Sequence, residues 1–391
     1  MTLILDVLFL AVGMGHLMVD VLNGHRSILL TYWSGPLGLS NAMLGVISTA
    51  YTLIASLIQP IFGYLADRLG PRWVASGGVL WMALFYSLAM VTPGHAAIYL
   101  LILASMGSGA FHPAGTMLAA LRGRTHAAGR ETTATASFFV FGQFGLFLGP
   151  MLAGLLLERF GVLGLLITAS LAWPVGIAVA RQLRGMLPPS RLTPSSDADK
   201  PAAPALKYGL GGLLSFALLA ALRSLAESNM NVFMPKYLSD LGQSPSTYGL
   251  VTALFMGGAA VGNVVGGSLA DRYGKRRIAM LTLSLASVPL FVFPMLGWSP
   301  WLYFFVPLAG SFTGASHSIL VVLAQRMFPG RMALASGLIL GFMFSSGALG
   351  TLLSGYLADL WGFPLVFQLT AVGVVVAAVL ASTLRESQGV N

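Results

Sequence analysis

Ionisable side chains are rare in this 391-residue sequence, and a few of them stand inside long apolar stretches. In the first stretch, His16, Asp20 and Asn23 are spaced at i, i+4 and i+7, so a helix would place them on one face. A carboxylate beside an imidazole can take up and release a proton. We therefore predict that Asp20 carries a proton and that His16 tunes it. The alternative is a hydrogen-bonded His16–Asp20 pair that only fixes helix packing.

A second polar stripe, Arg223, Glu227 and Asn231, follows in a later apolar stretch at i, i+4 and i+8. An arginine guanidinium is always charged and offers a planar fork that fits carboxylate or phosphonate. We predict that Arg223 and Asn231 bind an anionic or polar substrate group, and that Glu227 is a second candidate for proton coupling. The alternative is an internal Arg223–Glu227 ion pair that only stabilises its helix.

Two histidines, His112 and His317, occupy matching places in two other apolar stretches. We predict that both bind substrate, together with Asn23 and with Arg26. For each histidine, a hydrogen bond that only fixes helix packing stays open as an alternative. Arg26 stands near one end of its stretch, where a side chain that reaches the lipid headgroups would explain it equally well.

The elements that must position these residues are membrane-spanning helices. Apolar residues make up 56% of the chain and charged residues 8%, against about 25% charged residues in soluble proteins. A bilayer core takes about 20 apolar residues per helix. The residues at the start lack the basic region and the cleavage site of a signal peptide, so they begin the first span. We predict an all-α membrane protein with twelve spans, near 4–31, 42–66, 73–92, 96–121, 133–157, 162–181, 208–235, 247–270, 278–297, 300–324, 336–358 and 363–384.

Basic residues are unevenly spread over the predicted connections. Of the 21 lysines and arginines, only Arg159 and Lys236 lie in odd-numbered connections, and only Arg26 and Arg223 lie inside spans. Because basic loops stay on the cytoplasmic side, both termini are predicted to face the cytoplasm of a cell inner membrane. The net charge of +9 then reports topology, and no nucleic-acid partner is expected.

A proline-rich polar stretch divides the chain near its middle. Such sequence cannot pack a core and behaves as an extended tether. We predict an N-terminal six-helix bundle over 1–181, a cytoplasmic linker over 182–207 and a C-terminal six-helix bundle over 208–391. Two bundles joined by a flexible linker can rock against one another.

The two halves also match in sequence at an offset near 204. GYLADRLGPR at 63–72 corresponds to GSLADRYGKR at 267–276, and GAFH at 109–112 corresponds to GASH at 314–317. Internal repeats of this kind are typical of secondary transporters, whose sites lie near the midplane between the repeats.

The repeated G-x-L-A-D-R-x-G-x-[RK] pattern resembles the signature loop of the major facilitator superfamily, and the resemblance covers essentially the whole chain. It implies two pseudo-symmetric six-helix bundles whose first, fourth, seventh and tenth spans line a central cavity. The loops would then hold one state closed through carboxylates at helix ends; basic loops that only set topology are the alternative. The predicted gating residues are Asp67, Arg68, Arg72, Asp271, Arg272 and Arg276.

The fifth span reads GQFGLFLGPMLAG over 142–154, which resembles the glycine-rich motif of the superfamily's exporters. Small residues permit close helix contact and proline kinks a helix. The predicted packing and hinge residues are Gly145, Gly149, Pro150 and Gly154. Residues 15–20 and 107–113 are similar to the fosmidomycin-resistance group, which implies proton-driven efflux of small antibiotics, including an anionic phosphonate.

Taken with this resemblance, the residues predict a proton-coupled exporter of a small polar or anionic drug-like compound that works by alternating access. Its expected partners are the solute, protons and the lipid bilayer, and it is expected to be a monomer. No cofactor and no metal site is predicted, because three or more converging ligands are not evident from the spacing. An importer of small organic anions stays open, as does an exporter of a metal or metal chelate that uses the His16–Asp20 pair. An intramembrane enzyme is less favoured, because a hydrolase needs no duplicated gating loops.

Overall fold

The computed structural model describes residues 6–126, 131–186, 209–327 and 332–384, and every regular element within these ranges is helical. A 3₁₀ turn, Val162–Leu165, precedes α7. The α-helices are α1 Val7–Ser34, α2 Asn41–Leu57, α3 Gln59–Leu69, α4 Pro71–Val91, α5 Ala96–His126, α6 Glu131–Phe160, α7 Leu166–Gln182, α8 Leu210–Asp240, α9 Pro245–Tyr273, α10 Lys275–Leu296, α11 Leu302–Met327, α12 Met332–Trp361 and α13 Phe363–Ser382.

Within the described residues, twelve helical segments are long and apolar enough to cross a membrane, which confirms the predicted number. The chain is a multi-pass membrane protein. The second span, predicted as one run, consists of α2 and α3 with a break at Ile58. Pro60 explains the break, because proline has no backbone N–H to donate to the preceding turn.

The repeated loops have a shared backbone geometry. Gly70 between α3 and α4 has φ +95°, and Gly274 between α9 and α10 has φ +96°. Residues with a Cβ rarely adopt this region, so the second glycine of each loop motif allows one helix to end and the next to begin within a single residue.

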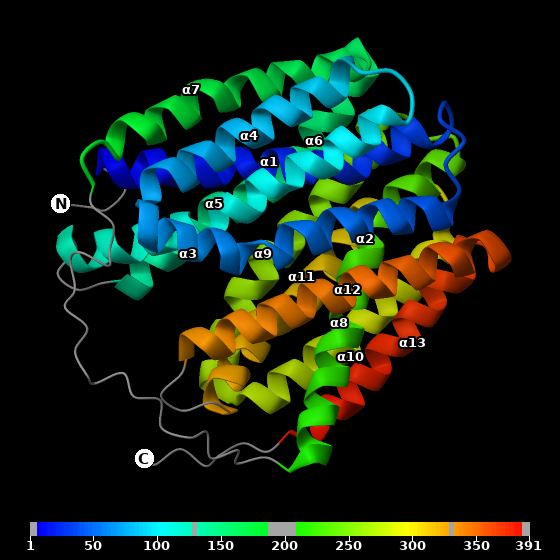
Figure 1. Cartoon of the computed structure of the whole chain (residues 1–391). Helices are drawn as coiled ribbons and strands as arrows, with labels where there is room; N and C mark the ends of the chain where they lie inside the picture. Colours follow the sequence, from blue (N-terminus) through cyan, green and yellow to red (C-terminus); the bar gives the residue numbers. More distant parts are fainter. Residues whose placement is uncertain (1–5, 127–130, 187–208, 328–331, 385–391) are drawn as a thin grey trace. The chain divides into compact units, whose positions relative to one another are not determined.

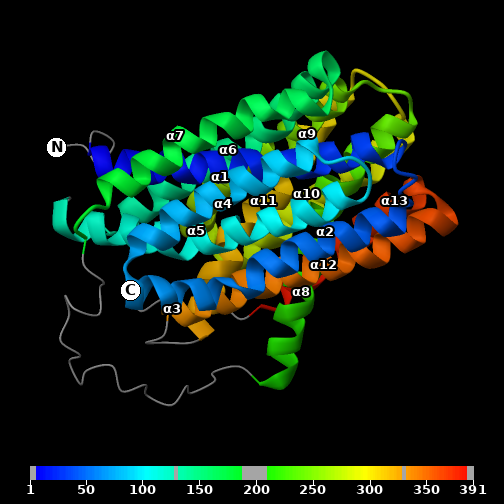
Figure 2. The same cartoon turned by 45° about the horizontal axis from the view of Figure 1, so that its top comes forward.

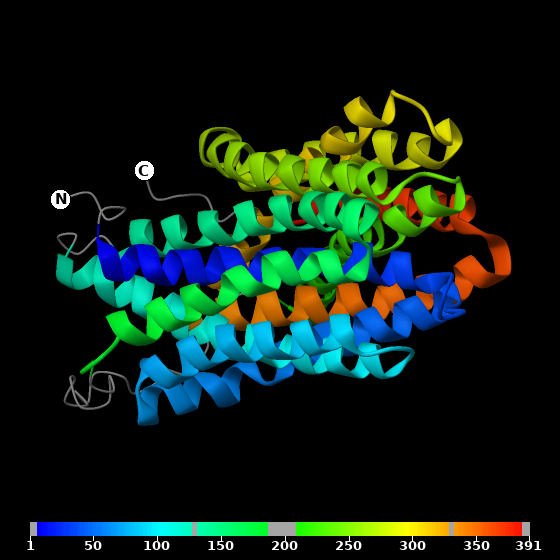
Figure 3. The ribbon, with the colours of Figure 1, turned by 90° about the horizontal axis from the view of Figure 1, so that it is seen from above.

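The chain forms two compact units. As far as the structure describes them, residues 1–38, 50–197 and 244–253 make up unit 1. In this unit α1 packs against α4, α5, α6 and α7, and α4 packs against α5 and α7. Figures 1 and 2 show α7, α4 and α1 side by side, and Figure 3 shows α6 running along α1. Helix α1 is therefore the centre of unit 1, and most of its residues are buried.

Unit 2 comprises residues 39–49, 198–243 and 254–391, as far as they are described. Helix α8 packs against α12 and α13, and α10 packs against α11 and α13. Of the predicted linker, residues 187–207 lie outside the described part of the chain. The predicted bundle boundaries therefore remain predictions.

Two carboxylates that were not predicted from the sequence accept hydrogen bonds from helix N-termini. Asp359 near the end of α12 accepts hydrogen bonds from the backbone N–H groups of Asn41 (2.9 Å) and Ala42 (2.8 Å), at the start of α2. Glu158, at the corresponding place in α6, accepts from the N–H of Ser246 (2.8 Å) at the start of α9. A carboxylate satisfies free N–H groups there and interacts favourably with the helix dipole.

Candidate functional site

The start of α1 is fixed to α5 by a charged contact. Asp6 caps α1 by accepting a hydrogen bond from the N–H of Phe9 (2.8 Å). The same carboxylate accepts two hydrogen bonds from Arg122 of α5, from Nε at 2.9 Å and from Nη2 at 2.8 Å. This bidentate contact sets the relation of α1 to α5, the two helices that supply the central cluster of the site.

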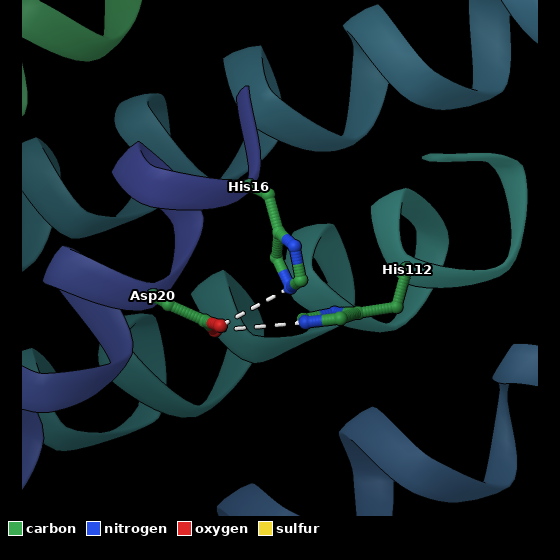
Figure 4. A group of neighbouring side chains, drawn as sticks. All are labelled: His16, Asp20 and His112. Atoms are coloured by element: carbon green, nitrogen blue, oxygen red, sulfur yellow. Dashed lines mark ion pairs between the residues drawn. The ribbon is translucent and has the colours of Figure 1, made fainter. Parts of the chain in front are cut away.

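That cluster consists of His16, Asp20 and His112 (Figure 4). His16 Nε2 lies 3.2 Å from Asp20 Oδ2, and His112 Nε2 lies 3.5 Å from Asp20 Oδ1. His16 and Asp20 are buried, whereas the His112 side chain is 23% exposed. The predicted i, i+4 pair is therefore present, and α5 adds the third residue. Three candidate metal ligands therefore converge here, which was not evident from the spacing in the sequence.

Backbone carbonyls fix the orientation of both rings. His16 Nδ1 lies 2.8 Å from the carbonyl oxygen of Phe138, and the ring stacks on the Phe138 ring at a centroid distance of 4.0 Å. His112 Nδ1 lies 2.8 Å from the carbonyl oxygen of Ser108. Because a carbonyl only accepts, each Nδ1 carries the hydrogen. Both Nε2 atoms therefore face the carboxylate, and a neutral ring would direct a lone pair at a negative charge. The arrangement suits a proton or another cation between the rings and the carboxylate.

A hydrogen-bonded row continues from Asp20 along the same face of α1. Asn23 Nδ2 donates to Asp20 Oδ1 (2.9 Å) and to the hydroxyl of Ser108 (3.0 Å). The Tyr51 hydroxyl of α2 donates to Asn23 Oδ1 (2.7 Å). The amide of Asn23 thus connects the charged cluster with a residue of a third helix.

Arg26 ends this row and lies inside unit 1. Its guanidinium carbon stands 4.8 Å from the centre of the Tyr51 ring, and Nη1 donates to the hydroxyl of Thr52 (2.9 Å). Its buried Nε has no hydrogen-bond partner, and no carboxylate among the described residues pairs with it. The guanidinium is thus held against α2. It is a cation with unused donor capacity.

Glycines of α6 allow this helix to pack closely against the side of α1 that carries the cluster. A Cβ atom at Gly145 would lie 2.5 Å from the carbonyl oxygen of Leu17, and one at Gly149 would lie 2.6 Å from that of Val21. A Cβ at Gly142 would lie 2.5 Å from the His16 ring and 2.6 Å from Asp20 Oδ2. Part of the glycine-rich motif thus packs directly on the cluster.

The remaining motif residues of α6 lie further along the helix. A Cβ at Gly154 would overlap the backbone of Pro245 in α9. Pro150 lies within the continuous α6 and contacts Gly24 of α1. Close packing by these glycines agrees with the predicted packing role, whereas a hinge at Pro150 remains a prediction.

The second polar stripe, on α8, has a different character. Arg223 is 2% exposed, forms an ion pair with Glu227 and donates from Nε to the carbonyl oxygen of Thr313 (3.1 Å). This is the internal ion pair that the spacing left open. Asn231 is half-buried further along α8. His317 of α11 is half-buried too, and within the described residues no hydrogen bond or ion pair involves it, although its motif matches that of His112.

The predicted gating residues lie at exposed ends of helices. Asp271 pairs with Lys275 one turn on (2.9 Å), and both Arg272 and Arg276 are exposed. Asp67 is exposed as well.

The basic residues of the first loop contact their own helices and α7. Arg68 lies over the ring of Tyr64, and Arg72 stacks on Trp73 while its Nε donates to the carbonyl oxygen of Ala180 (3.0 Å). The role of both loops in gating stays a prediction.

Sequence reasoning missed several residues of the site. Tyr51, Ser108, Phe138 and Thr52 carry no signal of their own, because hydroxyls and aromatic rings are common in membrane helices. Gly142 did carry a signal in the sequence, because it begins the glycine-rich motif.

Comparison with known proteins decides the family. The model of the Major Facilitator Superfamily matches residues 8–215 and again 216–389. The chain belongs to the major facilitator superfamily. This membership makes it a membrane transporter and not an enzyme, and the two matches agree with a fold of two related halves.

Two relatives match nearly the whole chain. The fosmidomycin resistance protein of Escherichia coli (strain K12) is 25% identical over 365 residues, which cover 92% of this chain and 88% of the relative. The uncharacterized MFS-type transporter YfnC of Bacillus subtilis (strain 168) is 28% identical over 368 residues, covering 91% of this chain and 87% of the relative.

Solved structures share the fold of this superfamily member. A bacterial homolog of the human lysosomal transporter Spinster, in an inward-facing and occupied conformation, aligns with a TM-score of 0.79 and 14% identity over 95% of both chains. The nucleoside transporter NupG aligns with a TM-score of 0.74 and 16% identity, covering 96% of this chain and 98% of its own.

Proposed function

We propose that this transporter is a proton-coupled exporter of a small polar or anionic compound, working by alternating access in the inner membrane with both termini in the cytoplasm. The observation that carries the proposal is the polar row on α1. It has a carboxylate between two imidazoles at one end, and at the other end an arginine that pairs with no carboxylate among the described residues. Buried ionisable groups in membrane helices are costly and are typical of ion and substrate pathways.

Arg26 is the better candidate for the anionic part of the substrate. The charge of Arg223 is already balanced by Glu227, and its Nε is used by a backbone carbonyl. Within the described residues, the guanidinium of Arg26 has a hydroxyl and an aromatic face as its partners, so a bound carboxylate or phosphonate would give it a full counter-charge. These contacts favour Arg26 over Arg223 as the residue that binds the anionic part of the substrate.

Asp20 is the proposed coupling residue, with His16 and His112 as its partners. Two hydrogen bonds join it to the neighbourhood of Arg26, one from Asn23 and one from Tyr51. An anion that draws Arg26 away from Tyr51 would alter the second of these bonds. Substrate binding and the protonation of the cluster would then depend on one another, as exchange of a proton for a solute requires.

Three observations support export and the proposed orientation. The glycine-rich α6 resembles the exporter motif, and its glycines lie against the cluster. The relative from Escherichia coli is named a fosmidomycin resistance protein, and resistance conferred by a transporter agrees with export. The distribution of basic residues supports cytoplasmic termini.

The test is uptake of fosmidomycin into proteoliposomes with an imposed pH gradient. We expect gradient-driven transport by the wild type, its loss in Asp20→Asn, and binding of the compound at least tenfold weaker in Arg26→Gln, because a charge-assisted hydrogen bond contributes about 1.5–3 kcal/mol. Arg181→Gln, which removes an exposed arginine of α7, is the control. Wild-type transport by Asp20→Asn would refute the coupling role, and unchanged affinity in Arg26→Gln would refute the anion site.

A further inference from the structure

The three residues in Figure 4 have the donor set of a metal site. We propose that His16, Asp20 and His112 bind one divalent transition-metal ion and leave a fourth position open for an anionic oxygen of the transported compound. The ion would take the place of the protons between the imidazoles and the carboxylate. The first part stands on the geometry of the cluster alone, whereas the role of the fourth position rests on the proposed function.

The spacing of the ligand atoms fits such an ion. Ligands about 2.0–2.1 Å from a tetrahedral ion lie roughly 3.4 Å from one another. The two observed imidazole–carboxylate separations are 3.2 Å and 3.5 Å, and all three ligand atoms lie within 4.8 Å of one another. These two separations end on different oxygens of Asp20, so an ion that binds Oδ2 requires His112 Nε2 to come closer to that oxygen. His112 is the partly exposed member, so its ring has the freedom to close this distance.

The surroundings of the ligands favour the same conclusion. Metal-binding histidines usually donate their other ring N–H to a carbonyl or carboxylate, which directs the free nitrogen at the ion. Both histidines do this here, through the carbonyls of Phe138 and Ser108. Asn23 holds the carboxylate in the same way, by donating to Asp20 Oδ1. Each of the three ligands is therefore already oriented by a second residue.

The ligand types indicate which ions fit. Imidazole with carboxylate suits Zn²⁺, Co²⁺ and Ni²⁺, whereas Mg²⁺ and Ca²⁺ favour six or more oxygen ligands. A divalent ion with two neutral imidazoles and one carboxylate keeps one positive charge. That charge, in a mostly buried cluster, would attract an anion into the fourth position.

The direct test is titration of purified, chelator-treated full-length protein with Co²⁺, followed by its visible absorption. Thermal unfolding with Zn²⁺ gives a second readout, and Mg²⁺ serves as the control ion. We expect saturation at one ion per chain and an affinity at least tenfold weaker in Asp20→Asn and in His112→Gln. His317→Gln, the repeat-matched histidine without a carboxylate contact in the described residues, is expected to bind Co²⁺ like the wild type.

Asn23→Ala keeps all three ligands and removes the hydrogen bond that orients Asp20, together with those to Ser108 and Tyr51. It therefore tests the site even where a ligand variant fails to fold. We expect its affinity for Co²⁺ to fall by about 10- to 100-fold. The metal site would be refuted by absence of saturable Co²⁺ or Zn²⁺ binding, or by wild-type affinity in Asp20→Asn.

Two comparisons separate this inference from the proposed function. Gradient-driven transport without metal binding would overturn the metal site alone. Metal binding that is lost in Asp20→Asn, in a protein without gradient-driven transport, would support the site and overturn the proposed function. For the open position, fosmidomycin is expected to bind at least tenfold more tightly with Zn²⁺ than with Mg²⁺; equal affinity would overturn this part.

Discussion

Gly142 on α6 offers a sharp test of how the cluster is built, because it is the point at which α6 meets both His16 and Asp20 of α1. A Cβ atom at this position would lie 2.5 Å from Cε1 and Nε2 of His16 and 2.6 Å from Asp20 Oδ2. Ordinary van der Waals contacts of a Cβ begin near 3.4 Å. Substitution by alanine therefore creates an overlap of almost 1 Å with both members of the pair, and His16 has little room to move because Phe138 covers its ring.

Two opposing effects decide the stability of Gly142→Ala. Alanine favours the helix over glycine by about 1 kcal/mol, whereas inserting a methyl group into a packed region costs about 1–3 kcal/mol. The net change in the free energy of unfolding is then between zero and about 2 kcal/mol of destabilisation. The larger effect falls on function, because separation of His16 from Asp20 removes a charge-assisted contact that contributes about 1.5–3 kcal/mol.

The assay compares Gly142→Ala with Gly77→Ala. Gly77 is also inside a helix, but a Cβ there would meet no atom within 4 Å. Alanine at this control position therefore raises the helix propensity without creating an overlap. We expect gradient-driven uptake of fosmidomycin and affinity for Co²⁺ each to fall at least tenfold in Gly142→Ala and to stay at wild-type values in Gly77→Ala. Wild-type transport and wild-type Co²⁺ binding in Gly142→Ala, with an unchanged midpoint of thermal unfolding, would refute the close packing of α6 on the cluster.

Three further predictions follow from other contacts. Arg223→Gln is expected to destabilise the protein by roughly 2–3 kcal/mol, because it leaves Glu227 without its partner. The affinity for an anionic substrate is expected to stay within about threefold of wild type. Thermal unfolding and binding measurements check both values, and a selective loss of anion binding would restore Arg223 as the substrate contact. Asp67→Asn and Asp271→Asn are each expected to shift the populations of the inward-open and outward-open states, measured as spin-label distances across the helix ends that carry the two loops. Unchanged distances in both variants would leave these loops with a topological role only. Asp359→Ala is expected to lower the free energy of unfolding by about 1 kcal/mol, because two N–H groups of α2 lose their acceptor. The control is Asp240→Ala, which removes an exposed ion pair. Equal midpoints of thermal unfolding for the two variants would contradict the capping role of Asp359.

The sequence by itself determined the class of the protein and much of its arrangement. Twelve spans could be counted because a helix in lipid must be apolar over a length that the bilayer sets. The face shared by His16 and Asp20 could be predicted, since the periodicity of a helix is a local property. The same holds for Arg223 and Glu227, whose ion pair was one of the two possibilities that their spacing allowed. The glycines of the repeated loops likewise gave the positions at which the chain turns.

Only the tertiary structure decided which of these groups form a site. His112 reaches Asp20 from a helix more than 90 positions further along the chain, and no pattern within either helix encodes that contact. The partners of the two arginines were equally inaccessible, because a guanidinium is free or neutralised according to what neighbouring helices place beside it. Packing of α6 on α1 through Gly142 and Gly145 brings the Phe138 carbonyl to His16 and thereby fixes where its Nε2 atom points. Helix formation obeys local rules, whereas the chemistry of a buried charge depends on every residue that surrounds it.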